Sequence, residues 1–283
     1  MSSSSLYVVA TPIGNMNDIT LRALEVLKEV YVIAAEDTRH THQLLSRHGI
    51  DTPLLALHEH NEEQMAPRLV EKLQGGQSVA LVSDAGTPLL SDPGYRLVRL
   101  AAAAGIKVSP IPGPSAVTAA LSVSGLATDR FTFEGFLPAR RNARIKLLES
   151  LRNEQRSTVL FESSHRILAC IEDMEAVMGS DRQVAICREM TKQFETVLRG
   201  TLAELHQRLA DDSNQRKGEF VIVLAAGHSG QSEDMARALE LGSALQEHLS
   251  VSQAARVAAR ICGVSRRELY VLMDNEPGSG SRT

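Results

Sequence analysis

The stretch of the chain with the most chemical potential runs from Ser83 to Gly94. It contains two aspartates, two glycines and two prolines in twelve residues, a composition that neither a strand nor a helix accommodates. The apolar run Val79–Val82 before it predicts a buried strand, and a helical pattern from Tyr95 to Ala104 follows it. Long loops at the carboxyl ends of strands are where open α/β sheets bind ligands. We therefore predict that this segment, called the central loop below, contacts a cofactor, although a rigid turn capped by Asp84 is the simpler alternative.

Carboxylates and cations follow two other predicted strands, the runs 31–35 and 183–187. A carboxylate can accept a proton, and a cation beside it can stabilise a developing negative charge. Each group is therefore a candidate rim of an active site, or alternatively an ion cluster that only stabilises the fold. The candidates for catalysis are Glu36, Asp37, Arg39, Arg188, Glu189 and Lys192.

A basic segment runs from Arg140 to Arg156. It has six basic and two acidic residues, a local net charge of +4 within a chain whose net charge is −4. A run of charges is commonly a solvated helix face, but this bias of sign favours contact with the phosphates of RNA. The candidate RNA contacts are Arg140, Arg141, Arg144 and Lys146.

The elements that must position these residues alternate between apolar runs and helical patterns. Up to residue 109 this alternation predicts βαβ units and a largely parallel sheet. The loop Thr11–Asn15 follows the first predicted strand and lacks the glycine spacing of dinucleotide folds and phosphate loops. Three prolines between residues 110 and 114 predict a domain boundary. We predict α/β domains at residues 1–113 and 114–228, a helical, helix-turn-helix-like appendage at 229–276, and a disordered tail at 277–283.

The appendage has six basic and seven acidic residues from Ser229 onward. This balance argues against unaided DNA binding, and it leaves RNA contact and simple helix packing as alternatives. Within the appendage, Ser252 is predicted to cap the second helix, and Gly263 lies in the turn after it.

The overall composition is that of a globular protein, with 43% hydrophobic and 23% charged residues. The three cysteines are scattered without metal-ligand spacing, which suits a reducing compartment. No apolar run is long enough to cross a bilayer, and the first five residues lack the features of a signal peptide. We expect a cytoplasmic protein with no metal and no membrane contact.

Eight short motifs occur in order between Leu6 and about Ala226. They are Thr11–Asn15, Ala35–Arg39, Ser83–Gly94, Pro112–Ala116, Ser124–Leu126, Gly135–Pro138, Arg188–Lys192 and Gly218–Phe220. In this set the chain resembles the bacterial ribosomal RNA small subunit methyltransferase I family, in the tetrapyrrole-methylase-like class of S-adenosylmethionine enzymes. That family commonly has leucine where this chain has Met190, a mild change of side chain.

The resemblance implies a two-domain α/β fold of the tetrapyrrole-methylase type, with the cofactor in the cleft between the domains, and a homodimer. It also implies 2′-O-methylation of a cytidine ribose in the decoding region of 16S rRNA, within the small ribosomal subunit. A tetrapyrrole C-methyltransferase on the same fold, or a non-catalytic RNA-binding factor of ribosome assembly, are the alternatives.

With this resemblance, we assign contacts with S-adenosylmethionine to the central loop and to segments that would face it. They are Pro12, Asp84, Ala85, Gly86, Thr87, Ser91, Ser115, Ala116, Phe161, Glu219 and Phe220. The proton of a ribose hydroxyl needs an acceptor, and the residues left open for this role are Glu36, Asp37, Glu162 and Glu189. Arg39, Arg188 or Lys192 could stabilise the charge that develops.

Overall fold

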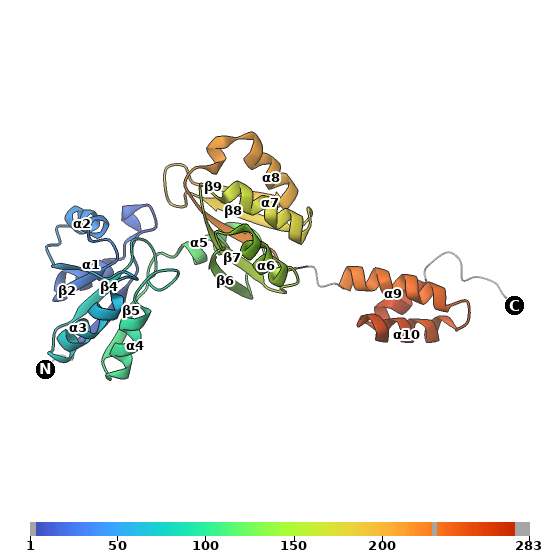
Figure 1. Ribbon diagram of the computed structural model, residues 1–283, viewed down its shortest axis with the longest axis horizontal. Helices are drawn as coiled ribbons and strands as arrows, with labels where there is room; N and C mark the ends of the chain where they lie inside the picture. Colours follow the sequence, from blue (N-terminus) through green and yellow to red (C-terminus); the bar gives the residue numbers. More distant parts are fainter. Residues whose placement is uncertain (1–3, 228–230, 275–283) are drawn as a thin grey trace. The chain divides into compact units, whose positions relative to one another are not determined.

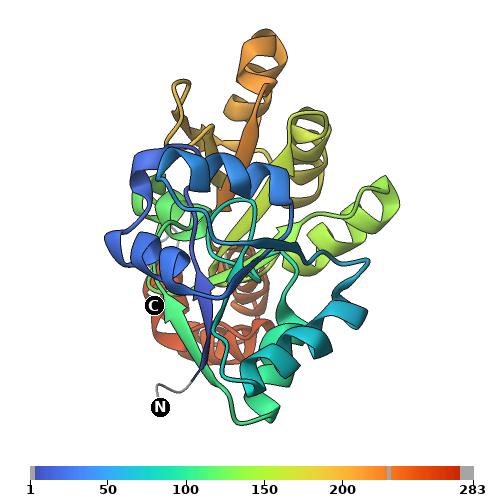
Figure 2. The same ribbon diagram turned by 90° about the vertical axis from the view of Figure 1, so that its left-hand side faces the viewer.

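The computed structural model describes residues 4–227 and 231–274. Two sheets with their helices form one compact unit, residues 1–148 and 157–225, which Figure 1 shows and Figure 2 views from the side of the N-terminal sheet. The C-terminal helices and the segment 149–156 form a second unit. The predicted α/β class with a helical appendage is therefore confirmed, whereas the predicted disordered tail, residues 277–283, lies outside the described residues.

The first sheet is parallel throughout, with the strand order β3-β2-β4-β1-β5. Its strands are β1 (Ser5–Val9), β2 (Val32–Ala35), β3 (Leu54–Ala56), β4 (Val79–Val82) and β5 (Lys107–Ile111). The connecting helices are η1 (Met16–Asp18), α1 (Leu21–Glu29), α2 (Thr38–Arg47), α3 (Glu62–Gln74) and α4 (Tyr95–Ala103). Because all five strands run in one direction, the loops that follow them gather at one edge of the sheet.

The central strand β4 is buried on both faces, as its continuous apolar sequence predicts. Ala80 and Val82 pack into the core under α1 and α2, whereas Val79 and Leu81 pack into the core under α3 and α4. This alternation follows from the two-residue period of a strand. Two helical layers therefore hold β4 in place and fix the position at which the central loop begins.

The second sheet has the strand order β6-β7-β10-β8-β9, in which only β6 and β7 pair in parallel. Its strands are β6 (Phe131–Phe136), β7 (Ser157–Ser163), β8 (Gln183–Arg188), β9 (Thr196–Thr201) and β10 (Glu219–Leu224). The helices of this half are α5 (Ala116–Ser124), α6 (Arg141–Leu151), α7 (Ile167–Met178), α8 (Leu202–Asp211) and η2 (Ser213–Arg216). One face of this sheet packs against Val117, Ala120 and Leu121 of α5. Because α5 begins shortly after β5, it connects the first sheet to the second.

The appendage consists of α9 (Gln231–Leu245), α10 (Val251–Cys262) and α11 (Arg266–Asp274). Its core is built largely from small side chains: Ala238, Ala254, Ala255, Ala258 and Ala259, with Leu269 and Met273. The second helix begins earlier than predicted, because Ser250 rather than Ser252 is its N-cap, and the Ser250 amide donates to Gln253 Oε1 at 3.2 Å. None of the helices described in either unit has the length and apolar character of a membrane span.

Candidate active site

The central loop has an unusual backbone. Gly86 and Gly94 adopt φ angles of +81° and +118°, and the non-glycine residues Leu89 and Ser91 adopt +74° and +70°. Positive φ is unfavourable for L-residues, so two such residues within three positions indicate a backbone held by its surroundings. Strain of this kind is concentrated at functional sites.

Hydrogen bonds to the loops after β1 and β5 hold the central loop. Thr11 and Gly86 exchange backbone hydrogen bonds of 2.9 and 3.0 Å, and Thr11 Oγ1 donates to the Ser83 carbonyl at 3.2 Å. Thr87 Oγ1 donates to the Pro114 carbonyl at 3.1 Å. The central loop is thus bound both to the loop after β1 and to the loop after β5.

Asp84 links the central loop to the end of β2. Its Oδ1 accepts a hydrogen bond of 2.9 Å from the backbone amide of Asp37. This contact brings Glu36, the first residue after β2, to the same cavity wall as Asp84. Asp84 therefore does more than cap its own loop.

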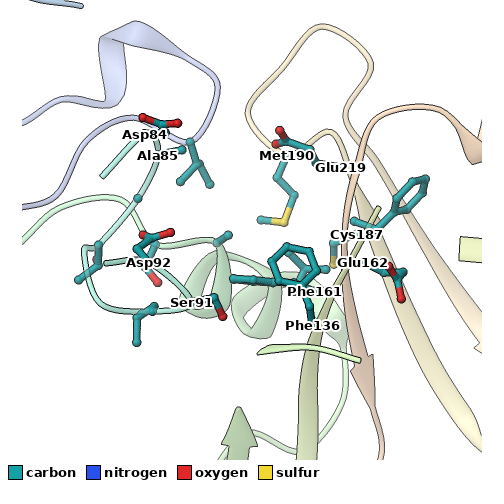
Figure 3. Close-up of a pocket in the computed structure, with 18 of the residues that line it drawn as sticks. Asp84, Ala85, Ser91, Asp92, Phe136, Phe161, Glu162, Cys187, Met190 and Glu219 are labelled. Carbon is teal, nitrogen blue, oxygen red and sulfur yellow. The ribbon is translucent and has the colours of Figure 1, made fainter. Parts of the chain in front are cut away.

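A cavity of about 450 Å³ lies between the central loop and the strand ends of the second sheet. Figure 3 shows Asp84, Ala85, Ser91 and Asp92 on one side of it, facing Phe136, Phe161 and Met190 on the other. The volume lies within the usual range of ligand and cofactor pockets, about 300–1,000 Å³. One wall is thus acidic and the opposite wall is largely apolar.

The acidic wall consists of Glu36, Asp84 and Asp92. Burial, followed by repulsion from Asp84 and Asp92, raises the pKa of Glu36 to about 7. Burial also raises the pKa of Asp92, with a hydrogen bond from Ser83 opposing it and Asp84 adding to it. Within residues 4–227 and 231–274, no lysine, arginine or histidine forms an ion pair with any of the three. The wall therefore carries negative charge that the described protein does not neutralise.

Ten of the eleven residues assigned to the cofactor line this cavity, all except Pro12. Pro12 is buried and lines a neighbouring cavity of about 200 Å³, which shares Asp84, Ala85 and Glu219 with the first. The parallel topology of the first sheet brings the loops after β1, β4 and β5 to one edge, and β7 and β10 of the second sheet supply the facing residues.

The six catalytic candidates separate into different environments. Glu36 lines the main cavity and Lys192 lines the neighbouring one. Asp37 pairs with Arg39 at 2.7 Å, and the hydrogen bonds from Arg39 hold the pKa of Asp37 well below its usual range. Neither of these two residues lines either cavity.

Arg188 and Glu189 hold together the end of the second sheet. Arg188 is largely buried and donates to the carbonyls of Lys217 and Phe194 at 2.7 and 3.2 Å. Glu189 Oε1 accepts from Lys192 Nζ and from the Glu219 amide, each at 3.0 Å. Burial alone would raise the pKa of Glu189, but these hydrogen bonds outweigh it and the pKa is lowered. Glu189 is thus engaged in an ion pair with Lys192, whereas Arg188 donates to backbone carbonyls.

Glu162, the remaining candidate base, lines the cavity but is almost fully buried. Its Oε1 accepts from the Ser163 amide at 2.8 Å, and its Oε2 lies 3.2 Å from Arg166. Both carboxylate oxygens of Glu162 are thus in contact with other groups of the protein. Of the four candidate bases, Glu36 is the one whose pKa is raised.

The prediction that Arg144 contacts RNA is wrong. Its side chain is buried and pairs with Asp173 of α7 at 2.7 Å, so it cannot contact RNA in this fold. Arg141 also binds Asp173, at 2.8 Å, although most of its side chain remains exposed. Arg140 and Lys146 are exposed, and neither pairs with a carboxylate among the described residues. The α6 segment turns one arginine inward to hold α7 and leaves the other basic groups outside.

Several cavity residues escaped the sequence analysis. They are Ile13, Leu90, Asp92, Phe136, Ser163, Cys187, Met190 and Val221. Asp92, Leu90, Phe136 and Met190 lie inside motifs that were identified, but the motifs do not show which side chains face the cavity. Within the described residues, no group of three or more histidine, cysteine or acidic side chains is arranged to hold a metal ion.

Comparison with known proteins identifies the family of the chain. The model of the tetrapyrrole (corrin/porphyrin) methylases matches residues 5–206, and that of the RsmI C-terminal HTH domain matches residues 229–273. Ribosomal RNA small subunit methyltransferase I of Xylella fastidiosa strain Temecula1 is 53% identical over 94% of this chain and 97% of its own length. The protein of that name from Escherichia coli O157:H7 is 51% identical over 95% of this chain and 94% of its own length.

Solved structures with the same fold have much lower identity. Diphthine synthase aligns with a TM-score of 0.60 and 21% identity, over 78% of this chain and 90% of its own. Cobalt precorrin-4 methyltransferase aligns with a TM-score of 0.58 and 19% identity, over 78% and 94% of the two chains. These structures support the fold alone, whereas the close relatives match both the α/β unit and the appendage. The chain therefore belongs to the tetrapyrrole methylases and, within them, to the ribosomal RNA small subunit methyltransferase I family.

Proposed function

We propose that the chain transfers a methyl group from S-adenosylmethionine to the 2′-oxygen of a cytidine ribose in the decoding region of 16S rRNA. The substrate would be the small ribosomal subunit, and the enzyme would act as a homodimer, which its mass in solution would test. The observation that carries the proposal is the cavity in which the unneutralised carboxylates of Glu36, Asp84 and Asp92 face an apolar wall.

The lining of this cavity fits S-adenosylmethionine. The cofactor is cationic at its sulfonium and ammonium groups and aromatic at its adenine. Carboxylates on the acidic wall complement the cationic end, and Phe161, Phe220 and Val221 offer apolar surface to the adenosine. Gly86 allows the backbone to come close, since a Cβ there would lie 3.3 Å from Ile13 and the φ of +81° disfavours other residues.

When bound, the cofactor supplies an electrophilic methyl group. The ribose hydroxyl is a poor nucleophile, and it becomes a better one as its proton is removed. We propose that Glu36 accepts this proton, because a pKa of about 7 suits a general base near neutral pH and the side chain lines the cavity. Asp84 would act on this step as well, by raising the pKa of Glu36 and by tying the end of β2 to the central loop.

The decisive experiment supplies labelled S-adenosylmethionine with three acceptors: assembled small subunits, naked 16S rRNA and a porphyrinogen. We expect label in 2′-O-methylcytidine after nucleoside analysis of the RNA. Label in the porphyrinogen would instead identify a tetrapyrrole methyltransferase. RNA binding without any transfer would identify a non-catalytic assembly factor.

A second experiment tests the cofactor assignment by calorimetry. Asp84→Asn keeps an acceptor for the Asp37 amide but removes the negative charge, so we expect weaker S-adenosylmethionine binding in an intact fold. Asp51→Asn, at an exposed aspartate outside the cavity, serves as the control. Equal affinity of the wild type and Asp84→Asn would reject the role of the acidic wall.

A further inference from the structure

Strand β6 contains an irregularity that determines where Phe136 points. Phe133 pairs with Val159 of β7, but the next pairs are Gly135 with Leu160 and Phe136 with Phe161, so Glu134 is an extra residue. In a regular strand, Phe133 and Phe136 would face opposite sides of the sheet because they are three positions apart. The bulge puts both on the face that carries Val159 and Phe161.

Gly135 makes this bulge possible. Its φ of +66° lies in the left-handed region, which favours glycine. A Cβ at this position would also lie 2.8 Å from Ser91 Oγ, so the bulge fits closely against the central loop. Bulges next to active sites commonly re-aim a side chain, and here the re-aimed side chain is Phe136.

Phe136 is supported on one side only. Its ring packs edge-on against Phe161, with centroids 5.6 Å apart, and Phe161 packs in the same way against Phe133 at 4.9 Å. Phe133 and Phe161 continue into the apolar core beneath α5. Phe136 lies on the edge strand of the sheet and is 54% exposed.

Among the large apolar side chains that are exposed in the described residues, two line the cavity: Phe136 and Leu90. Phe136 directly follows Gly135 in the sequence, and Leu90 directly precedes Ser91. The close approach of Gly135 to Ser91 therefore lies next to both side chains. Aromatic surface left open at the mouth of a catalytic pocket is suited to stacking with a planar group.

The segment after Phe136 is held firmly and leads to basic groups. Arg166 donates to the carbonyls of Leu137 and Pro138, and its guanidinium pairs with Glu162 at 3.2 Å. Arg140 follows within four residues of Phe136 and directly precedes α6, and Lys146 lies on α6. Phe136 therefore lies in the chain between the cavity and the exposed basic groups of α6.

We propose that Phe136, with Leu90, is the stacking site for the base of the target nucleotide, which leaves the RNA stack so that its ribose can enter the cavity. The inference rests on the proposed RNA methyltransferase function. Proteins that recognise single-stranded RNA stack unpaired bases on aromatic side chains in this way. The base of the RNA fits this position better than the adenine of the cofactor, because Phe136 is half exposed at the sheet edge whereas Phe161 and Phe220 are further inside.

Fluorescence of a Phe136→Trp variant of the full chain tests the occupant directly. The chain has no tryptophan, so the introduced indole would be a unique probe. We expect its emission to change when small subunits or naked 16S rRNA are added, and to change little with S-adenosylhomocysteine alone. A full change with S-adenosylhomocysteine alone would assign the position to the adenine, and no change with either would overturn the stacking site.

Kinetics of Phe136→Ala provide the second test, with Phe131→Ala as the matched control. Phe131 lies on the same strand and is 42% exposed, but it does not line the cavity. Loss of a base–aromatic stack corresponds to a fall in kcat/KM for the RNA of roughly 5- to 150-fold. We expect this fall for Phe136→Ala, rescue by Phe136→Tyr, unchanged S-adenosylmethionine affinity by calorimetry, and no effect of Phe131→Ala.

Methylation of rRNA and stacking on Phe136 are separable properties of the protein. If the wild type transfers no label to rRNA, the proposed function fails whatever the variants do. If the wild type methylates rRNA and Phe136→Ala keeps its kcat/KM, only the stacking site is overturned. Parallel losses of RNA turnover and cofactor affinity in Phe136→Ala would also overturn it, in favour of an adenine contact.

Discussion

Carboxylates in the two halves of the α/β unit have opposite electrostatic environments. At the end of the first sheet, Glu36 and Asp92 have raised pKa values and no cationic partner among the described residues. Beside the second sheet's strands in the chain, Asp173 of helix α7 is buried but pairs with Arg144 and Arg141 of α6. Burial alone would raise the pKa of Asp173, yet the hydrogen bonds from these arginines lower it. The second sheet neutralises its buried charge internally, whereas the first keeps negative charge at a cavity wall.

This difference distinguishes carboxylates that stabilise the fold from carboxylates that we expect to serve function. A buried ion pair is costly to break, because removal of one partner leaves an uncompensated charge. Carboxylates that repel one another destabilise the fold, and their persistence is best explained by a ligand or a reaction that needs them. We therefore expect substitutions at Asp173 to affect mainly folding, and substitutions at Glu36 to affect mainly turnover.

Glu36→Gln should have the largest effect. Glutamine has a similar shape but cannot accept the hydroxyl proton, so we expect the methylation rate to fall by roughly 10²- to 10⁴-fold. The wild-type rate should rise with pH through about 7, as Glu36 loses its proton, and this rise should be absent from the variant. Single-turnover methylation of small subunits across the pH range measures both effects.

The control for this experiment is Glu59→Gln. Glu59 is exposed and lies outside the cavity, but it adds a small repulsion to Glu36. We expect near-normal turnover with a slightly lower pH midpoint. A Glu36→Gln enzyme with normal turnover would remove Glu36 as the base.

Asp173→Ala should destabilise the protein by about 3–5 kcal/mol, because Arg144 would remain buried without its carboxylate. Urea unfolding at neutral pH measures the change. Glu172→Ala, an exposed carboxylate one position earlier on α7, should change the free energy of unfolding by less than about 0.5 kcal/mol. Similar stabilities of the two variants would mean that the Asp173 pairs do not stabilise the second sheet.

The contrast between the two sheets could be only partly predicted from the sequence. The position of the cavity follows from topology, since apolar runs alternating with helices dictate parallel strands whose loops meet at one edge. The family resemblance assigned Asp84, Ser115 and Phe161, far apart in the chain, to one site, and all three line the same cavity.

The inward turn of Arg144 could not be predicted, because its partner Asp173 is 29 residues away and the pairing depends on how α6 packs on α7. The sequence alone does not distinguish Arg144 from Arg140, because both belong to the same basic segment. The bulge at Gly135 was missed for a related reason: a glycine within a strand pattern permits a bulge but does not require one. The extra residue becomes evident only from the pairing of β6 with β7.

The pH dependence of stability should differ in sign between Glu36 and Glu189. The folded-state pKa of Glu36, about 7, lies above its ordinary value of 4.5, so ionisation in the folded state is unfavourable. Stability is therefore lost as pH rises from about 4.5 to about 7, and Glu36→Gln should be more stable than the wild type at pH 8, with a smaller advantage at pH 5. We expect the free energy of unfolding of the variant to exceed that of the wild type by about 1 kcal/mol at pH 8, because Glu36 is only half-buried and solvent screens the repulsion.

Glu189→Gln should show the opposite behaviour. The pKa of Glu189 is lowered, so its charged form stabilises the fold above its ordinary pKa, and this contribution is lost as pH falls through the folded-state pKa. The variant should be less stable than the wild type at pH 8. Thermal unfolding of both variants at pH 5 and pH 8 compares the two sites. If both substitutions change the stability at pH 8 in the same direction, the distinction between the sheets fails.

The smallest expected effect concerns Arg140, directly before α6, and Lys146 on α6, which form no ion pair among the described residues. Arg140→Ala with Lys146→Ala should weaken binding to 16S rRNA and reduce the slope of log affinity against log salt concentration by about 2, or about 1 for each phosphate that the variant no longer neutralises. Cofactor affinity should not change, since neither residue lines the cavity. The matched control is Arg130→Ala with Lys107→Ala, at exposed basic residues outside the α6 segment. If the control pair and the α6 pair lower the salt dependence equally, RNA binding is not localised on α6. If only the α6 pair lowers it, the cations that Asp173 does not neutralise are the ones that contact the RNA.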